Sequence, residues 1–173
     1  TLSAQFEDAI GLPISEVFRY FNPEPIGSAS IGQVHRATLH DGQDVAVKVQ
    51  YPGIAQSIDS DMNHLGRMLR LGRVFMSKER ADAFVEEARQ TIMAESDYRQ
   101  EAANLNQFSS LFANWNDVRI PKPVMEYCRK TVLVMEYIDG TPFDDAVLAI
   151  EDVDERNTVC TRFIEIFVHM VHD

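Results

Sequence analysis

The sequence predicts an α+β fold in which a small antiparallel sheet is followed by long helices. Residues 33–39 and 44–50 read as β-strands, and the Asp-Gly pair in the turn between them is a hairpin signal. Residues 78–114 and 151–173 place apolar side chains on one side at helical spacing, which is typical of amphipathic helices. The apolar run at 131–137 is typical of a buried strand.

The composition restricts the partners and the compartment. The chain has 173 residues, enough for one domain with a sizeable core, and it is 45% hydrophobic and 25% charged. Its net charge of −11 argues against nucleic acid and against an anionic membrane surface, because both need an excess of Lys and Arg. Cys128 and Cys160 lie far apart without metal-ligand spacing, so we expect a reducing compartment and no metal site. No apolar run reaches the roughly 18 residues of a membrane-spanning helix.

The first segment is predicted to form two short helices, over residues 1–10 and 14–21, separated at Gly11-Leu12-Pro13. The second helix would place Val17, Phe18 and Phe21 on one side. Proline disfavours helix in the residue before it, so the Asn-Pro pair that follows ends this helix.

Small side chains fill the turn before the hairpin. Gly27, Ser28, Ala29 and Ser30 follow one another there, and Gly32 comes shortly after them. With so little side chain in this turn, a phosphate-sized group could approach the backbone closely.

The strand at 44–50 carries one charged side chain among valines. Strand side chains alternate between faces, so Val45, Val47 and Val49 face one way and Lys48 shares the other face with Ala46. A lysine in this setting is partly desolvated and needs an anionic partner. A small-residue turn, a hairpin and such a lysine are the parts of a protein-kinase nucleotide lobe. The alternative is an ordinary surface hairpin whose lysine reaches water.

The helices that follow supply a candidate partner for Lys48. A helical pattern runs over residues 54–75, and a long helix is predicted over 78–114. In the long helix Glu101 is the only charge on an otherwise apolar face, and Asp97 lies one turn before it. That face consists of Ala94, Tyr98, Glu101, Leu105, Phe108 and Phe112.

Two carboxylates this close require a cation, and Lys48 is the candidate. In one alternative Glu101 lies at the rim of the apolar face, where Arg99 or solvent neutralises it. In another, Asp97 pairs with Lys48 instead.

The last part of the chain is predicted as two strands and two helices. A strand over 124–127 and a turn at Arg129-Lys130 lead into the strand at 131–137, and weak helical character follows over 144–150. The helix at 151–173 carries an apolar face, so we expect it to drive formation of a homodimer or larger species, or to fold back onto the sheet. That face is formed by Val159, Phe163, Ile166, Phe167 and Met170.

Four stretches together resemble the UbiB/AarF family of atypical protein-kinase-like proteins, which support ubiquinone and related prenyl-lipid pathways. The resemblance covers roughly residues 10–173 and rests on the four stretches appearing in this order and spacing. The stretches are Pro-Ile-Gly-Ser-Ala-Ser-Ile-Gly-Gln-Val-His (25–35), Val-Ala-Val-Lys-Val-Gln-Tyr-Pro-Gly (45–53), Glu-Ser-Asp-Tyr-Arg-Gln-Glu-Ala-Ala-Asn (95–104) and Val-Leu-Val-Met-Glu-Tyr-Ile-Asp-Gly (132–140).

The resemblance implies a set of nucleotide-binding residues. The turn at 27–30 would be the family's alanine-rich loop, with Gly27 and Ser28 standing where alanines are usual. Lys48 would contact the phosphates, Met135 would be the gatekeeper, and the backbone of the hinge would bind adenine. The implied set for ATP or ADP is Gly27, Ser28, Ala29, Ser30, Ala46, Lys48, Met135, Glu136 and Ile138.

The resemblance also assigns the acidic residues of the long helix. Glu101 would form the ion pair with Lys48, in agreement with the pairing inferred from the apolar face. Glu95 and Asp97 match the family's Glu-x-Asp motif, which holds a Lys-x-Gly-Gln segment over the pocket.

From these assignments we expect a protein-kinase-like small lobe, a hinge and the first helices of the large lobe. Residues 1–24 would form a helical extension, and 25–137 the small lobe with a family-specific helical insert at about 54–76. The hinge and the start of the large lobe would follow at 138–173. Residues 78–114 would be the helix that carries the glutamate.

We expect the parent protein to be longer at both ends. The Lys-x-Gly-Gln segment would precede residue 1, and the catalytic and metal-binding residues would follow residue 173. The resemblance therefore assigns no catalytic residue to this chain and implies Mg²⁺ only with the later segment. Cytoplasmic, membrane-facing or organellar-matrix locations all fit, and the parent could associate with a membrane or a prenyl lipid.

Three functions remain open. The chain could be the adenine-nucleotide-binding lobe of an atypical kinase or ATPase. It could instead be a regulatory module that only senses nucleotide and recruits partners through its acidic surface. A small-molecule phosphotransferase of the aminoglycoside type shares the lobe but has no reason to carry Glu95 and Asp97 at this spacing.

Overall fold

The structure is a computed structural model that describes residues 2–71 and 77–172, without the side chains of residues 70, 71, 94, 95 and 172. The contacts between residues divide the chain into two compact units. The sheet unit comprises residues 1–106 and 121–137, and the helical unit comprises residues 107–120 and 138–173. No helix among the described residues is long and apolar enough to cross a membrane.

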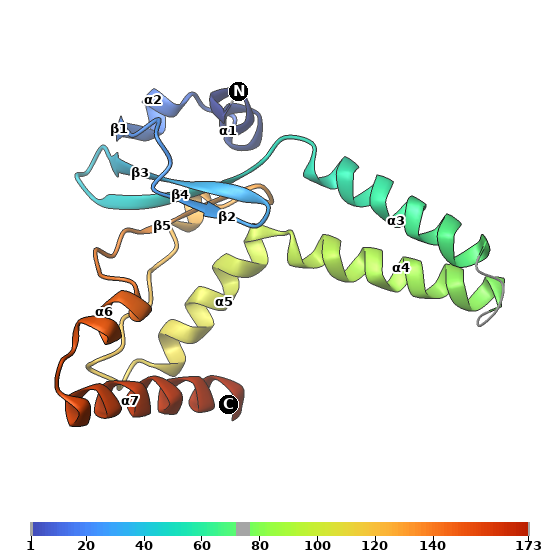
Figure 1. The fold of residues 1–173 in the computed structure, drawn as a ribbon. Helices are drawn as coiled ribbons and strands as arrows, with labels where there is room; N and C mark the ends of the chain where they lie inside the picture. Colours follow the sequence, from blue (N-terminus) through green and yellow to red (C-terminus); the bar gives the residue numbers. More distant parts are fainter. Residues whose placement is uncertain (1, 72–76, 173) are drawn as a thin grey trace. The chain divides into compact units, whose positions relative to one another are not determined.

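A five-stranded antiparallel sheet forms the centre of the sheet unit (Figure 1). Its strands lie in the order β1-β3-β4-β5, and β2 also pairs with β3. The strand bounds are Phe18–Phe21 for β1, Gly27–Ala29 for β2, Gly32–Leu39 for β3, Asp44–Gln50 for β4 and Val132–Glu136 for β5. The predicted hairpin is therefore β3-β4, and the predicted buried strand is β5.

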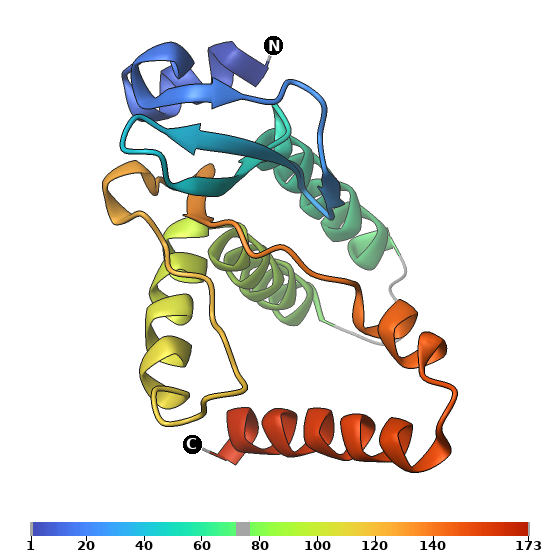
Figure 2. The ribbon, with the colours of Figure 1, turned by 90° about the vertical axis from the view of Figure 1, so that its left-hand side faces the viewer.

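The valines of β4 face the main hydrophobic core, as predicted. Val45 and Val47 are completely buried, and Val49 is 1% exposed. Helix α1 (Leu2–Ile10) packs on this face and contributes Phe6, which contacts Phe18 with 5.4 Å between ring centroids. Figures 1 and 2 both show α1 on one side of the sheet and the beginning of α5 on the other. Each buried valine contributes about 1.5–3 kcal/mol to folding.

The helix predicted over 14–21 is only half correct. Helix α2 covers Ile14–Val17, and the next four residues form β1, which pairs with β3 at Phe18↔Leu39 and Phe21↔Ala37. The edge of β3 supplies backbone hydrogen-bond partners there, and a strand satisfies them while still burying Phe18. The segment expected to be a helical extension therefore contributes a strand to the sheet.

The helix predicted over 78–114 is two helices, α4 (Lys78–Glu95) and α5 (Tyr98–Leu111). The prediction of one continuous helix is wrong because distant groups bind the backbone at the break. The buried side-chain amide of Gln50 donates to the Ser96 carbonyl, and the Tyr98 N–H donates to the Lys130 carbonyl at 3.0 Å. These bonds replace helical ones, so interrupting the helix leaves few backbone groups unpaired.

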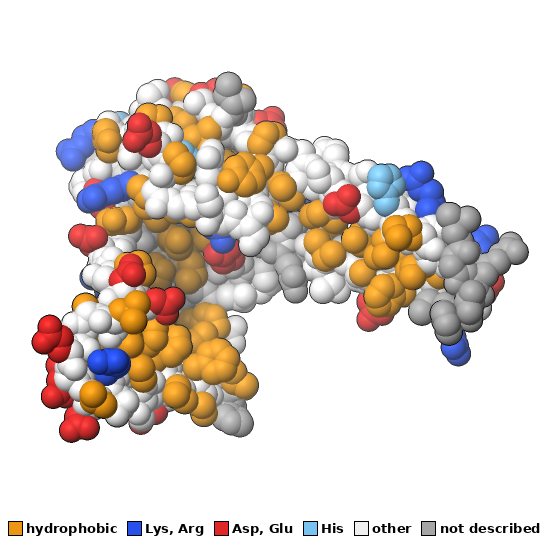
Figure 3. Space-filling view, viewed as in Figure 1, with side chains coloured by type: hydrophobic (Ala, Val, Ile, Leu, Met, Phe, Trp, Pro, Cys, Tyr) orange, Lys and Arg blue, Asp and Glu red, His pale blue; other side chains and the backbone are white. Residues whose placement is uncertain are grey.

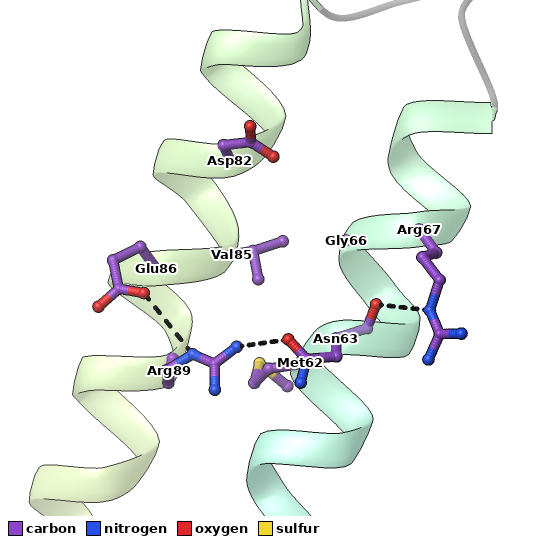
Figure 4. Close-up of a pocket in the computed structure, with 8 residues that line it drawn as sticks. All are labelled: Met62, Asn63, Gly66, Arg67, Asp82, Val85, Glu86 and Arg89. Carbon is purple, nitrogen blue, oxygen red and sulfur yellow. Dashed lines mark hydrogen bonds and ion pairs between the residues drawn. The ribbon is translucent and has the colours of Figure 1, made fainter.

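Helices α3 (Ile54–Leu71) and α4 lie side by side as a hairpin (Figures 1 and 2). Arg89 of α4 joins them through Asp59 and through the Asn63 side chain, which lies 3.0 Å from its Nη2. Arg89 and Asn63 are among the residues that line a cavity between the two helices (Figure 4). The volume of this cavity is about 630 Å³. The predicted helix at 54–75 matches α3 up to residue 71, and residues 72–75 lie outside the described residues.

The strand predicted over 124–127 is wrong: Met125–Tyr127 is a short 3-10 helix, η1. The Val124 N–H donates to the Val134 carbonyl at 2.8 Å, and the Arg129 N–H donates to the Val132 carbonyl at 2.7 Å. Because the chain must turn back into β5 between these two points, it forms a tight turn instead of a second ladder.

The helical unit contains α6 (Phe143–Ala149) and α7 (Val153–His172), close to the predicted ranges. In α7 the predicted apolar face is largely uncovered, with Phe163 48% and Phe167 60% exposed. Figure 3 shows hydrophobic side chains gathered over this helix. Arg162 of α7 binds Asp117 at 2.6 Å and lies over the Trp115 ring, which ties the helix to residues 107–120.

Candidate functional site

An ion pair joins the sheet to α5. The Lys48 ammonium lies 2.8 Å from both carboxylate oxygens of Glu101. Lys48 comes from β4, on the face opposite the valines, and Glu101 comes from the first turn of α5. The predicted contact between the two residues is therefore present, and the bidentate geometry fixes the direction of the ammonium.

Solvent access limits what this pair adds to stability. The exposed fractions are 19% for the Lys48 side chain and 40% for the Glu101 side chain. At this exposure an ion pair contributes about 1 kcal/mol or less. The pair is therefore better suited to positioning a charge than to holding the fold together.

The small-residue turn and the ion pair line one cavity of about 440 Å³. The prediction of a turn over residues 27–30 is only partly correct: Gly27–Ala29 form strand β2, and the turn itself covers residues 30 and 31. Strand β2 leads through this turn into β3, where Gly27 pairs with Val34 and Ala29 pairs with Gly32. Gly27 itself is exposed and does not line the cavity. The lining residues are Ser28, Ala29, Ser30, Ile31, Lys48, Ile58, Ile92, Ser96, Tyr98 and Glu101. The Lys48 ammonium and the serine hydroxyl groups meet here beside the Glu101 carboxylate and several apolar side chains, and the ammonium and hydroxyl groups suit an anionic oxygen-rich group.

Three of the residues assigned to the adenine end, Ala46, Met135 and Glu136, lie along β4 and β5, outside this cavity. Ala46 and Met135 are directly paired across the two strands, and Ala46 is 6% exposed. Glu136 ends β5, with its N–H donated to the Lys122 carbonyl at 2.8 Å. Ile138 belongs to the helical unit and is 36% exposed. Ala46 and Met135 are therefore neighbours in the sheet unit, whereas Ile138 belongs to the helical unit.

Asp97 caps α5 rather than competing for Lys48. Its carboxylate accepts the Arg99 N–H at 3.0 Å and pairs with the Arg99 guanidinium at 2.6 Å. This guanidinium holds the pKa of Asp97 below its usual value. Glu95, the other acidic residue of the predicted motif, is the last residue of α4, and its side chain lies outside the described residues.

Two site residues were missed by sequence reasoning. The first is Gln50, which is 6% exposed and whose side-chain amide donates to the Ser96 carbonyl at the break between α4 and α5. This bond fixes the start of α5, the helix that carries Glu101 in its first turn. The second is Tyr98: the Lys48 ammonium lies over its ring, 4.7 Å from the ring centroid. The strand alternation that placed Lys48 also places Gln50 on the same face, and that signal could have identified it.

Comparison with known proteins identifies the family. The family model for the ABC1 atypical kinase-like domain matches residues 1–173. The atypical kinase coq-8 of Caenorhabditis elegans, described as mitochondrial, is 42% identical over 162 residues, which cover 94% of this chain and 21% of that protein. A probable protein kinase UbiB of Marinobacter nauticus is 39% identical over 169 residues, which cover 95% of this chain and 31% of that protein.

A solved structure shows the same fold. The Rv3197–erythromycin complex from Mycobacterium tuberculosis matches with a TM-score of 0.69 and 31% identity, covering 86% of this chain and 37% of that one. This chain spans about a fifth to a third of the two curated relatives. The five-stranded sheet with its lysine and helix glutamate is thus a kinase-like small lobe, and the chain belongs to the ABC1 atypical kinase-like family, which includes the UbiB and COQ8 proteins.

Proposed function

We propose that the sheet unit binds an adenine nucleotide, ATP or ADP, with its phosphates beside Lys48. The observation that carries this proposal is the Lys48–Glu101 ion pair opening onto the cavity under the small-residue turn. In kinase-like lobes a strand lysine held by a helix glutamate contacts the phosphates. The adenine ring would pack on the sheet face that carries the paired residues Ala46 and Met135, next to the backbone of Glu136.

Each residue of the cavity has a distinct task in this proposal. Lys48 neutralises phosphate charge, and Glu101 directs the ammonium. Ser28, Ala29 and Ser30 allow the backbone of the turn to approach the phosphates, because they carry little bulk. The cavity has room for a phosphate group and offers it a cation and hydroxyl groups, so the residues present fit the ligand.

Magnesium would bind together with the nucleotide, as a complex with its phosphates. Glu101 is occupied by Lys48, so it is a poor ligand for a second cation. In kinase-like proteins Mg²⁺ bridges the phosphates and is held by residues of the large lobe. We therefore assign no metal ligand to the described residues and expect Mg²⁺ to strengthen binding only weakly in this chain.

For the parent protein we propose an atypical kinase or ATPase of ubiquinone or related prenyl-lipid metabolism. The family membership supports this role, and so do the names of relatives described as mitochondrial or chloroplastic. An organellar location follows for the parent by the same argument. Phosphoryl transfer needs one aspartate to orient the nucleophile and another to hold the metal, and we assign neither to this chain. The chain alone should therefore show no ATP turnover that Lys48→Ala abolishes.

A nucleotide sensor is the second candidate. The described residues supply the Lys48–Glu101 ion pair, and we assign no catalytic residue to them, so a site of this kind suffices to report nucleotide occupancy without carrying out chemistry. The two candidates differ in what the full-length protein does with bound ATP. Turnover that requires Lys48 supports the enzyme, whereas nucleotide binding without turnover supports the sensor.

Calorimetric titration with ATP and Mg²⁺ tests the proposal. We expect weak binding by the unaltered chain and at least a roughly tenfold loss in Lys48→Ala, because a phosphate contact by a charged group contributes about 1.5–3 kcal/mol. Lys78→Ala is the matched control, since it removes the same charge from an exposed position at the start of α4. Equal affinities for the chain and its Lys48→Ala variant would overturn the proposal.

A further inference from the structure

We propose that Tyr98 is the positioning residue of this site: its ring holds the Lys48 ammonium in place beneath the small-residue turn. The inference rests on the proposed nucleotide function, and it adds a residue that neither the lysine nor the glutamate assignment requires. Tyr98 is the first residue of α5 and is 2% exposed.

The first observation is the contact with the lysine. The Lys48 ammonium lies 4.7 Å from the centroid of the Tyr98 ring while it binds Glu101 at 2.8 Å. Cation–π attraction and the carboxylate therefore hold the same ammonium, and both groups come from the first turn of α5. A lysine side chain has many rotamers, and these two contacts restrict it before any ligand arrives.

The second observation is the contact with the end of the turn. A Cβ added at Gly32, the first residue of β3, would lie 2.9 Å from the Tyr98 hydroxyl oxygen. Ile31 packs against the small cluster formed by Tyr98 and Leu133, on the sheet face opposite the valine core. One buried side chain thus touches both the lysine and the residues that close the small-residue turn.

The third observation concerns the hydroxyl group. It is buried and has no hydrogen-bond partner among the described residues. An unsatisfied buried hydroxyl destabilises a fold, so the group is not there for stability. It lies where a side chain at residue 32 would otherwise lie, because a Cβ added at Gly32 would come within 2.9 Å of it.

These contacts give Tyr98 a role in preorganisation. Nucleotide binding must immobilise Lys48, and a lysine that is already immobile loses less side-chain entropy on binding. Removing the ring would leave Glu101 as the one group directing the ammonium among the described residues. Affinity for nucleotide should then fall because the restraint on Lys48 is lost.

Two variants at Tyr98 separate the ring from the rest of the side chain. Tyr98→Phe keeps the ring and removes the unpartnered hydroxyl, whereas Tyr98→Leu removes the ring and keeps an apolar side chain. We expect Tyr98→Leu to weaken ATP binding by roughly 3- to 30-fold, the range given by a partly buried cation–π contact, and Tyr98→Phe to rescue it. Tyr127→Leu is the control, because Tyr127 packs against the valine core. Gly32→Ala is unsuitable, since its Cβ would also lie 2.4 Å from the Val49 carbonyl oxygen.

A spectroscopic readout tests the contact without nucleotide. Protons of the Lys48 side chain next to the ammonium should be shifted upfield by the ring in an NMR spectrum of lysine-labelled protein, with Lys48→Ala identifying the signals. The shift should remain in Tyr98→Phe and vanish in Tyr98→Leu. Its absence from the unaltered chain would overturn the inference even if Tyr98→Leu failed to fold.

The two readouts also separate this inference from the proposed function. If the chain binds no nucleotide but shows the ring-dependent shift, the positioning contact stands and the proposed function fails. If Lys48→Ala weakens ATP binding while a folded Tyr98→Leu binds as tightly as the unaltered chain, the function stands and the role of Tyr98 is wrong.

Discussion

The two faces of strand β4 differ in the kind of contact that their side chains make: apolar packing on one face and specific polar contacts on the other. Val45, Val47 and Val49 face a core filled by other apolar side chains, including Phe6 of α1. Lys48 and Gln50 point to the other face, where each meets particular polar atoms at the start of α5 or at the α4–α5 break. The first face needs only side chains of suitable volume, whereas the second needs partners with a specific geometry. Substitutions on the valine face should therefore change stability, and those on the lysine face should change how the site is held.

Val47→Ala should have the largest effect on stability. The Val47 side chain is completely buried, so its truncation removes apolar contacts and leaves a cavity. We expect the free energy of unfolding to fall by about 2–3 kcal/mol, measured by urea denaturation. Lys48→Ala should cost about 1 kcal/mol or less in the same assay. Equal losses for the two variants would mean that the faces do not differ as argued.

Alkaline pH should affect the lysine face through Tyr98. Burial, with the nearby Glu101 charge, raises the pKa of Tyr98 to about 12 from its ordinary value of 10.0. A phenol with a raised folded pKa supplies stability that is complete below pH 10.0 and is lost as pH rises towards 12. We expect the unaltered chain to lose about 2 kcal/mol more than Tyr98→Phe over this range.

The measurement is urea denaturation of both proteins at several pH values. Comparing the two curves cancels the titration of lysines and the other tyrosines. Parallel pH dependence would show that the Tyr98 hydroxyl titrates normally and is not buried as described.

Gln50→Leu should disturb the α4–α5 break. The substitution removes the amide that donates to the Ser96 carbonyl and leaves that buried acceptor without this bond. We expect a loss of about 1–2 kcal/mol in the free energy of unfolding. We also expect faster hydrogen exchange at the Tyr98 N–H, which binds the Lys130 carbonyl beside the break. If the exchange rate of the Tyr98 N–H were the same in Gln50→Leu, its bond to the Lys130 carbonyl would be sufficient to maintain the break between the two helices.

The apolar face of α7 provides a third kind of surface, apolar yet uncovered. Phe163→Glu with Phe167→Glu should lower the free energy of unfolding by about 0.5–1.5 kcal/mol, because Phe163 stacks on Phe143 with 4.3 Å between ring centroids, whereas Phe167 is 60% exposed. They should also affect association: we expect sedimentation to show a homodimer or larger species that becomes monomeric in the double variant. A monomer before substitution would contradict this.

Local patterns predicted much of the sheet unit. Alternation along residues 44–50 placed the valines on one face and Lys48 on the other, and β4 has these bounds. Helical spacing placed Glu101 on the apolar face of α5, where Tyr98 and Ala102 are buried. Such patterns are readable because a strand or helix repeats over a few residues, so burial of one face leaves a periodic trace.

The sequence by itself therefore determined the hairpin and the direction of Lys48, and it favoured Glu101 over Asp97 as the carboxylate partner. Tertiary structure alone decided that residues 18–21 form a strand, that the long helix breaks at Ser96-Asp97, and that Tyr98 lies against both Lys48 and Gly32. Each of these features depends on groups far apart in the chain, such as Gln50 and Ser96, which leave no periodic trace in either segment. A helix pairs its backbone N–H and C=O groups internally, and local sequence preference favours it for that reason. Where distant residues supply hydrogen bonds and packing for those same groups, the chain can leave the helix without losing backbone pairing.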